Sequence, residues 1–291
     1  MKRFILGCLF YLTPACALGI TLGERLEYQV VYNGYASSFL DWEVADASFT
    51  VNPTLVAFAQ EHAYQLLVEV DSSAYALADT LFKARFSYKS LLNASKTRNL
   101  LVEEKNNGTR LKHKVVWFDW QRHFAQLFKI RRKKKINTSW MSSEKRWVVL
   151  KNENIPEWLL QNYTAPKLGV PYFRDAGKGR IPIEEGIVDQ LSATYLFRTQ
   201  DIVLGKRYDF PICTGKKVLT YSLTVDSEKT LKVNGKKWET YEVTINTDNL
   251  PGVFQRSDDS HLKVWITRDA QHIPVLFEVG VKYGVFTVSL K

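Results

Sequence analysis

Residues 26–32 read LEYQVVY, and Asn33-Gly34 follows them directly. Apolar and polar side chains mostly alternate along this stretch, a pattern that is typical of a β-strand with one buried face. Asn-Gly supplies the positive φ angles that a tight hairpin requires, so the pair predicts a turn after the strand.

The same alternation recurs along both halves of the chain, at residues 64–70, 82–88, 219–225, 238–245, 262–267 and 281–290. Further Asn-Gly pairs occur at 107–108 and 234–235. Strands of this spacing, separated by turn residues, predict a mainly β protein with large curved antiparallel sheets.

One helix is predicted at residues 187–198, which read IVDQLSATYLFR. Apolar side chains surround this segment, so we expect it to be buried against a sheet. Asp189 and Ser192 have the spacing of a helix cap and its hydrogen-bond partner. Arg198, at the other end, should pair with a buried carboxylate or with a helix-end carbonyl.

The two halves resemble one another. Residues 23–28 (GERLEY) match 205–210 (GKRYDF) in pattern, and Trp117 followed by His123 parallels Trp265 followed by His272. We therefore expect one β-rich domain over 18–291, built as two β-meander halves with features of a duplicated unit. The halves span about 18–135 and 186–291, and an insertion containing Pro and Gly, residues 129–185, joins them.

The first 17 residues have the organisation of a secretory signal. Lys2 and Arg3 precede a short apolar run, 4–12, and Ala15-Cys16-Ala17 ends the segment. The run is too short to span a bilayer, so we expect cleavage after Ala17. Lipid attachment at Cys16 is the alternative, but the residues before it lack the usual branched apolar side chain.

Signal removal changes the charge and the cysteine count. The formal net charge falls from +10 to +8 because Lys2 and Arg3 are lost, and Cys213 becomes the remaining cysteine of three. An intramolecular disulfide is then excluded, and the apolar surroundings of Cys213 predict a buried thiol. Beyond the signal, no apolar run reaches the length of a transmembrane helix.

The composition excludes several classes of protein. With 45% hydrophobic and 13% aromatic residues, the chain can bury a core and is neither intrinsically disordered nor collagen-like. Metal-binding pairs, phosphate-binding loops and nucleophile motifs do not occur in the sequence. We therefore identify no catalytic, cofactor-binding or metal-binding residue.

A dense basic cluster follows the first half. The cluster consists of Lys129, Arg131, Arg132, Lys133, Lys134 and Lys135. Such a run is typical of a solvated loop or linker. The functional alternative is contact with an anionic membrane, lipopolysaccharide or cell-wall polymer. Nucleic acid is not expected, because the protein is predicted to be exported and has no recognisable nucleic-acid-binding module.

Three motifs together resemble the bacterial exported-protein family known as domain of unknown function 3108. They are Gly23-Glu24-x-Leu26-x-Tyr28-x-Val30-x-Tyr32-x-Gly34, Asp189-x-Leu191-Ser192-Ala193-x-Tyr195-x-x-Arg198, and Val264-Trp265-Ile266-x-x-Asp269-x-x-x-x-Pro274-Val275. The resemblance implies a β-rich fold in a Gram-negative periplasm, and it brings no catalytic residues. Its most characteristic positions are interpreted as structural: Asp189, Leu191, Ser192, Tyr195, Arg198, Trp265, Asp269 and Pro274.

Three functions are compatible with these observations. The leading hypothesis is a non-enzymatic envelope protein that offers a concave apolar surface to a lipid, a lipoprotein or another envelope protein. The second is a cell-wall or glycan hydrolase whose carboxylates come from distant strands, since such pairs need no local motif. The third is a structural interaction protein of the periplasm.

Overall fold

The computed structural model describes residues 20–37, 40–81, 83–108, 112–130, 173–175, 180–246, 262–281 and 283–291. Within these ranges sixteen strands pair into a single antiparallel sheet, which confirms the mainly β prediction. The strands are β1 Arg25–Gly34, β2 Trp42–Val51, β3 Val56–Phe58, β4 Glu61–Asp71, β5 Arg85–Asn93, β6 Asn99–Asn106, β7 Lys112–Asp119, β8 Phe124–Ile130, β9 Phe173–Asp175, β10 Ile181–Pro182, β11 Arg207–Cys213, β12 Val218–Val233, β13 Lys236–Ile245, β14 Leu262–Thr267, β15 Pro274–Val281 and β16 Gly284–Leu290. The described helices are η1 Tyr35–Ser37, α1 Ala76–Leu81 and α4 Gln190–Phe197.

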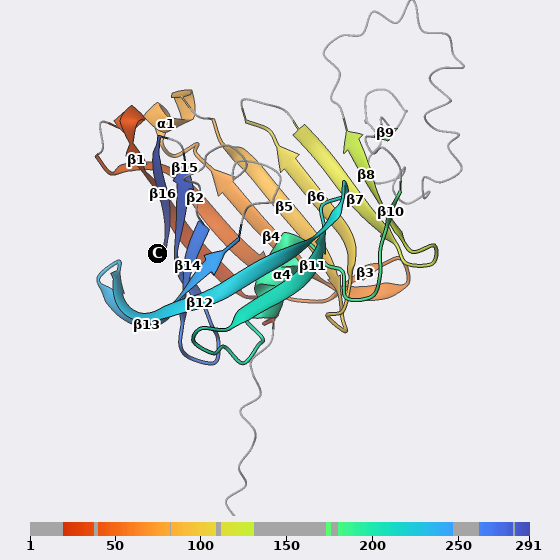
Figure 1. Ribbon diagram of the computed structural model, residues 1–291. Coiled ribbons are helices and arrows are strands. Elements are labelled where there is room, and N and C mark those ends of the chain that lie inside the picture. Colours follow the sequence, from red (N-terminus) through yellow and green to blue (C-terminus); the bar gives the residue numbers. More distant parts are fainter. Residues whose placement is uncertain are drawn as a thin grey trace, which may run out of the picture.

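The two halves of the chain meet in the middle of this sheet (Figure 1). β1 pairs with β2 on one side and with β16, the last strand, on the other, in a register that runs from Tyr28↔Leu290 to Gly34↔Gly284. From this seam, β2, β4, β5, β6, β7 and β8 follow in one direction, and β15 back to β11 follow in the other. The halves therefore share one continuous sheet.

Matching backbone geometry accompanies the sequence similarity of the halves. Gly23 and Gly205 precede β1 and β11 with φ angles of 80° and 77°. The N–H of Gly23 donates to the carbonyl of Val51 at 3.2 Å, and that of Gly205 donates to Val225 at 2.8 Å. A left-handed glycine two residues before each of these strands is thus bonded to the neighbouring strand.

The second similarity concerns the hairpins β7–β8 and β14–β15. His123 and His272 stand just before β8 and β15, and both have positive φ angles, 52° and 45°. In each turn an aspartate, Asp119 or Asp269, accepts a hydrogen bond from the N–H two residues later, at 3.1 and 3.0 Å. Both histidines therefore belong to turns of the same kind.

The segment 180–189 connects the two edges of the sheet. β10 pairs with β8 through Ile181, and Val188 forms an isolated parallel bridge with Ile212 of β11. After β11, the turn at Gly215 comes so near to β7 that a Cβ atom there would lie 2.6 Å from Cγ2 of Val116. The sheet is therefore curled until its two edges, β8 with β10 at one and β11 at the other, approach each other.

Helix α4 lies inside this curve (Figure 1). Its buried side chains are Leu191, Ser192, Ala193, Tyr195 and Phe197, and the apolar ones join a core cluster with residues of both halves. Burial is thus as predicted, although the helix is shorter than residues 187–198. The sheets were expected to pack around this helix and to offer a concave apolar surface to a partner. In the described part of the chain, α4 packs against the concave side.

The Asn-Gly prediction was wrong at Asn33-Gly34 and right at Asn234-Gly235. The latter forms the tight β12–β13 turn with φ angles of 46° and 82°. Gly34 is instead the last residue of β1, opposite Gly284 of β16. A Cβ on Gly34 would lie 2.7 Å from the Gly284 Cα, so close approach of two strands explains this glycine.

Two strand boundaries also differ from the prediction. The stretch 82–88 contains the start of β5, which begins at Arg85 because α1 precedes it. The stretch 281–290 spans a turn, since β15 ends at Val281 and β16 begins at Gly284. Alternation continued through both connections, and periodicity alone did not reveal them.

Candidate functional site

The helix motif begins with a cap. Asp189 is buried and stands directly before α4, and its Oδ1 accepts hydrogen bonds from the N–H groups of Leu191 at 2.8 Å and Ser192 at 3.3 Å. Its Oδ2 accepts from the Ser192 hydroxyl at 2.8 Å. These contacts confirm the interpretation of Asp189 and Ser192 as a cap and its partner.

The same carboxylate joins the helix to the sheet. Oδ2 of Asp189 accepts from Nδ2 of Asn99 at 2.5 Å and from the hydroxyl of Ser90. Asn99 reciprocates, since its Oδ1 accepts the Asp189 N–H at 2.9 Å. A buried charge is tolerated when several donors surround it, so this network holds α4 against β5 and β6.

The buried Tyr221 and the partly buried Tyr88 complete the surroundings of Asp189. Burial, followed by the nearby Asp189 charge, raises the pKa of Tyr88 well above its usual value. Burial raises the pKa of Tyr221 to about 12. Both hydroxyls therefore stay protonated at neutral pH, and that of Tyr88 donates to Oδ1 of Asp189 at 3.3 Å.

Arg198 connects the end of α4 to both halves. Its Nη1 and Nη2 donate to the two carboxylate oxygens of Glu24, each at 2.7 Å, and Nη2 also donates to the carbonyl of Gln271 at 3.2 Å. The Arg198 carbonyl lies 2.8 Å from Nδ1 of His272. The predicted carboxylate partner is therefore Glu24, which belongs to the first motif of the chain.

The remaining motif residues are also engaged in the fold. Asp269 Oδ1 accepts from the Thr267 hydroxyl at 2.7 Å, and the carbonyl of Pro274, at the start of β15, accepts from the hydroxyl of Tyr28 at 2.8 Å. Trp265 is buried on β14, and Tyr195 is buried on α4 beneath the Arg198 guanidinium. The motif thus forms the internal framework of the protein.

Two buried carboxylates on the sheet escaped sequence analysis. Glu103 on β6 binds Lys89 at 2.6 Å, Lys105 at 2.9 Å and His113 at 2.7 Å. Burial alone would raise its pKa, but the hydrogen bonds from His113 and Lys89 outweigh burial and hold the pKa well below the usual range. Cross-strand register, which no local motif records, brings these groups together.

Glu242 on β13 has a similar arrangement. It pairs with Lys229 of β12 and, at 2.7 Å, with Lys263 of β14, while the hydroxyl of Ser227 donates to it at 3.1 Å. Burial opposes ionisation, yet the lysine hydrogen bonds lower the pKa of Glu242 to about 2. Each half of the sheet therefore carries a buried carboxylate between basic side chains.

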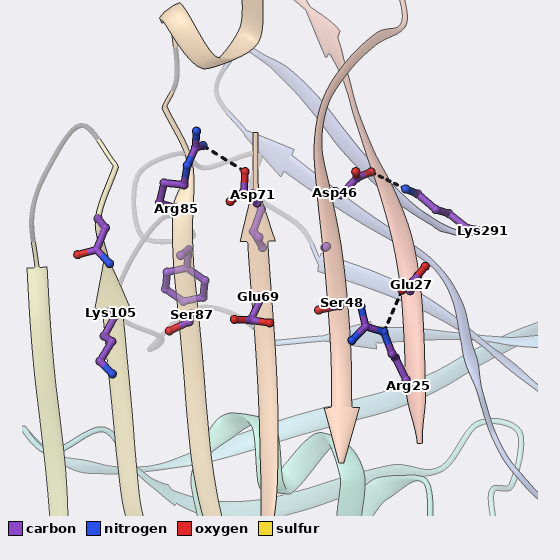
Figure 2. Close-up of a pocket in the computed structure, with 14 residues that line it drawn as sticks. Arg25, Glu27, Asp46, Ser48, Glu69, Asp71, Arg85, Ser87, Lys105 and Lys291 are labelled. Carbon is purple, nitrogen blue, oxygen red and sulfur yellow. Dashed lines mark hydrogen bonds and ion pairs between the residues drawn. The ribbon is translucent and has the colours of Figure 1, made fainter. Parts of the chain in front are cut away.

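A polar depression of about 510 Å³ crosses strands β1, β2, β4, β5 and β6 (Figure 2). Charges of both signs line it, and several are paired: Arg25 with Glu27 at 2.9 Å, Lys291 with Asp46 at 2.6 Å. Its charged lining consists of Arg25, Glu27, Asp46, Glu69, Asp71, Arg85, Lys105 and Lys291. Such a surface suits a polar partner that carries both charges.

Exposed apolar side chains gather at one end of the sheet. We call this set the apolar rim: Tyr35 (78% exposed), Leu40 (70%), Leu77 (66%), Leu81 (57%) and Tyr283 (64%). It comes from η1, α1, the residue two before β2, and the β15–β16 turn, which lie together at the upper left of Figure 1. Sequence analysis missed it because these residues lie in connections between strands.

The predicted basic contact lies largely outside the described residues. Lys129 is part of β8, where its backbone pairs with Lys114 of β7 and Arg174 of β9. Arg131, Arg132, Lys133, Lys134 and Lys135 lie outside the described ranges, as do the signal at 1–17 and Cys16. β8 ends at Ile130, opposite His113, on the same end of the sheet as α1.

Cys213 is a buried free thiol, as predicted, and burial raises its pKa to about 11. In the described ranges, no group of three or more His, Cys, Asp or Glu residues is arranged to hold a metal ion. Among the helices that the structure describes, none is long and apolar enough to cross a membrane.

Comparisons with known proteins bear on family and fold. A solved chain described as "Crystal Structure of Beta-barrel-like Protein of Domain of Unknown Function DUF1849 from Brucella abortus" is similar, at 9% identity. The match covers 93% of this chain and 96% of that one, with a TM-score of 0.45. No curated protein matches.

The model of the family described as "Protein of unknown function (DUF3108)" matches residues 163–291, the range that holds the helix motif and the closing motif. Residues 163–291 are thus similar to the family DUF3108, which the helix motif and the closing motif predicted, and the first motif at 23–34 lies outside the matched range.

Proposed function

We propose that the protein is an exported, non-enzymatic binding protein of the bacterial envelope that holds a lipid, a lipoprotein or an envelope protein against its outer surface. The observation that carries the proposal is the apolar rim, because monomeric proteins rarely expose several large apolar side chains together without a partner. The signal pattern at 1–17 and the family resemblance support export.

The position of α4 favours the outer surface over the interior. Leu191, Tyr195 and Phe197 fill the concave side, and the Asp189 network holds the helix there. An acyl chain could enter this space only by displacing α4 and breaking that network. Binding at the rim requires no such rearrangement.

A specific observation bears on the hydrolase alternative, namely the carboxylates that share the polar depression. Glycoside hydrolysis needs one carboxyl group with a raised pKa to act as the acid. In the depression, hydrogen bonds from Ser73 lower the pKa of Asp71. Asp79, Glu103, Asp209 and Glu242 also have lowered pKa values. The pKa values of these described carboxyl groups are thus displaced in the direction opposite to the one that an acid catalyst needs. This supports a binding function over glycoside hydrolysis.

The test is isolation of the full chain from the envelope of a Gram-negative host, followed by N-terminal sequencing and native mass spectrometry. We expect a chain that begins after Ala17 and carries a lipid or an envelope protein. A chain retained in the cytoplasm, or an exported chain without any bound partner, would contradict the proposal. Release of sugars from cell-wall material that Glu69→Gln abolishes and Glu185→Gln does not would support the hydrolase.

A further inference from the structure

We propose that the apolar rim docks the protein peripherally on the surface of a bilayer that contains anionic lipid. The inference rests on the proposed function and narrows its partner to the membrane surface itself. It assigns an orientation in which the end of the sheet bearing η1, α1 and the β15–β16 turn faces the bilayer (Figure 1).

The rim is continuous although its residues are far apart in sequence. The N–H of Tyr35 donates to the carbonyl of Tyr283 at 3.0 Å, which sets η1 beside the β15–β16 turn. On α1, Ala78 is buried in a cluster with Tyr32 and Val44, so the helix packs against β1 and β2. Three connections, β1–β2, β4–β5 and β15–β16, thus present one apolar edge.

The exposed face of α1 is held rigidly. Arg85 donates to both carboxylate oxygens of Asp79, at 2.7 and 3.2 Å, and the hydroxyl of Tyr75 donates to Asp46 at 2.8 Å. These bonds fix the polar side of the helix on the sheet. Leu77 and Leu81, one turn apart, therefore remain directed to solvent as a preformed contact.

A bilayer fits this surface better than a protein partner does. The side chains come from separate turns and a short helix, and a fluid lipid surface adapts to such a dispersed set. Leucine side chains partition into the acyl boundary, and tyrosine favours the headgroup level of the interface.

Charge complementarity favours anionic lipid. The formal net charge of the chain is +10, and it is +8 once residues 1–17 are removed. β8 ends at Ile130 on the same end of the sheet as the rim, immediately before the basic run that starts at Arg131. Basic residues near a membrane surface strengthen binding to acidic headgroups in a salt-dependent way.

The test is flotation of the signal-free chain with vesicles of phosphatidylethanolamine and phosphatidylglycerol. We expect wild-type protein to float with them. The triple variant Leu40→Ser, Leu77→Ser, Leu81→Ser should bind about tenfold more weakly or worse, since three exposed leucines no longer insert into the bilayer surface. Leu204→Ser is the matched control, because Leu204 is 52% exposed in the loop before β11, at the other end of the sheet. It should float like wild type.

Equal urea midpoints would establish that the variants are folded. A Leu77→Trp variant gives a second readout of membrane contact, the emission of the introduced tryptophan. Its fluorescence should shift to the blue when anionic vesicles are added. Absence of wild-type flotation and of this shift would overturn the inference, as would equal losses in the triple and control variants. If a protein partner still co-purifies from the envelope in that case, the proposed function stands and the bilayer inference alone fails.

Discussion

The guanidinium of Arg198 and the carboxylate of Glu24 form a two-pronged ion pair, with both N–O distances at 2.7 Å, across 174 positions of sequence. The side chains are only 10% and 13% exposed. One partner ends α4 and the other precedes β1, so the pair joins the helix to the seam between the two halves.

Glu24→Gln should lower the free energy of unfolding by about 3 kcal/mol, because Arg198 would keep a buried charge without its counter-ion. Urea denaturation measures the change. Glu27→Gln is the control, since Glu27 pairs with Arg25 on an exposed surface and should cost less than about 1 kcal/mol. Equal effects of the two substitutions on the free energy of unfolding would show that the Arg198–Glu24 ion pair does not stabilise the fold more than an exposed pair does.

The contact between the β11–β12 turn and β7 gives a second prediction. Gly215 has a φ of 73° and sits against Val116, whereas Gly235 has a φ of 82° with no atom near its missing Cβ. Gly235→Ala should cost about 1 kcal/mol through backbone strain alone. Gly215→Ala should cost about 2 to 4 kcal/mol, because steric overlap adds to the strain. Indistinguishable thermal midpoints would show that the sheet edges do not approach as described.

Stability should fall in acid because of Glu242. Its pKa is about 2 in the folded protein against 4.5 ordinarily, so the unfolded chain takes up more protons as the pH falls between these values. The stabilisation is fully present above about pH 5 and is lost as the pH approaches 2. Urea midpoints measured from pH 7 to pH 3 should therefore decline below pH 5. Glu242→Gln should start lower at pH 7 and decline less steeply, and a parallel decline would refute this assignment.

The Cys213 thiol should react slowly with a disulfide reagent in the native protein and rapidly in urea, because burial limits access and keeps the thiolate scarce. The same titration counts thiols. Unfolded protein isolated after export should contain one thiol per chain, since Cys8 and Cys16 leave with the signal. Three thiols per chain would contradict cleavage after Ala17.

Much of the framework was predictable from local patterns. Alternation identified the strands, and the Asp189 and Ser192 spacing identified the cap, because both depend on residues close in sequence. For Arg198, the sequence predicted only the kind of partner, a buried carboxylate or a helix-end carbonyl. Glu24 lies 174 positions away, and only the folded arrangement of helix and sheet brings it near.

The candidate surfaces were less predictable for the same physical reason. The polar depression and the clusters around Glu103 and Glu242 arise from cross-strand register, which a sequence does not display. No pattern in the sequence marks Leu77 and Leu81 as exposed. Their exposure follows from the way Asp79 and Arg85 fix the other side of α1.

The most direct test of membrane docking is the depth of a spin label on the rim. Leu77→Cys, labelled with a nitroxide in a Cys213→Ala chain, should collide more with oxygen and less with a polar nickel complex once anionic vesicles are present. Lys232→Cys, on the exposed β12–β13 hairpin at the other end of the sheet, should show no such change. A label at 77 that stays as water-accessible as the label at 232, with vesicles present, would contradict the account.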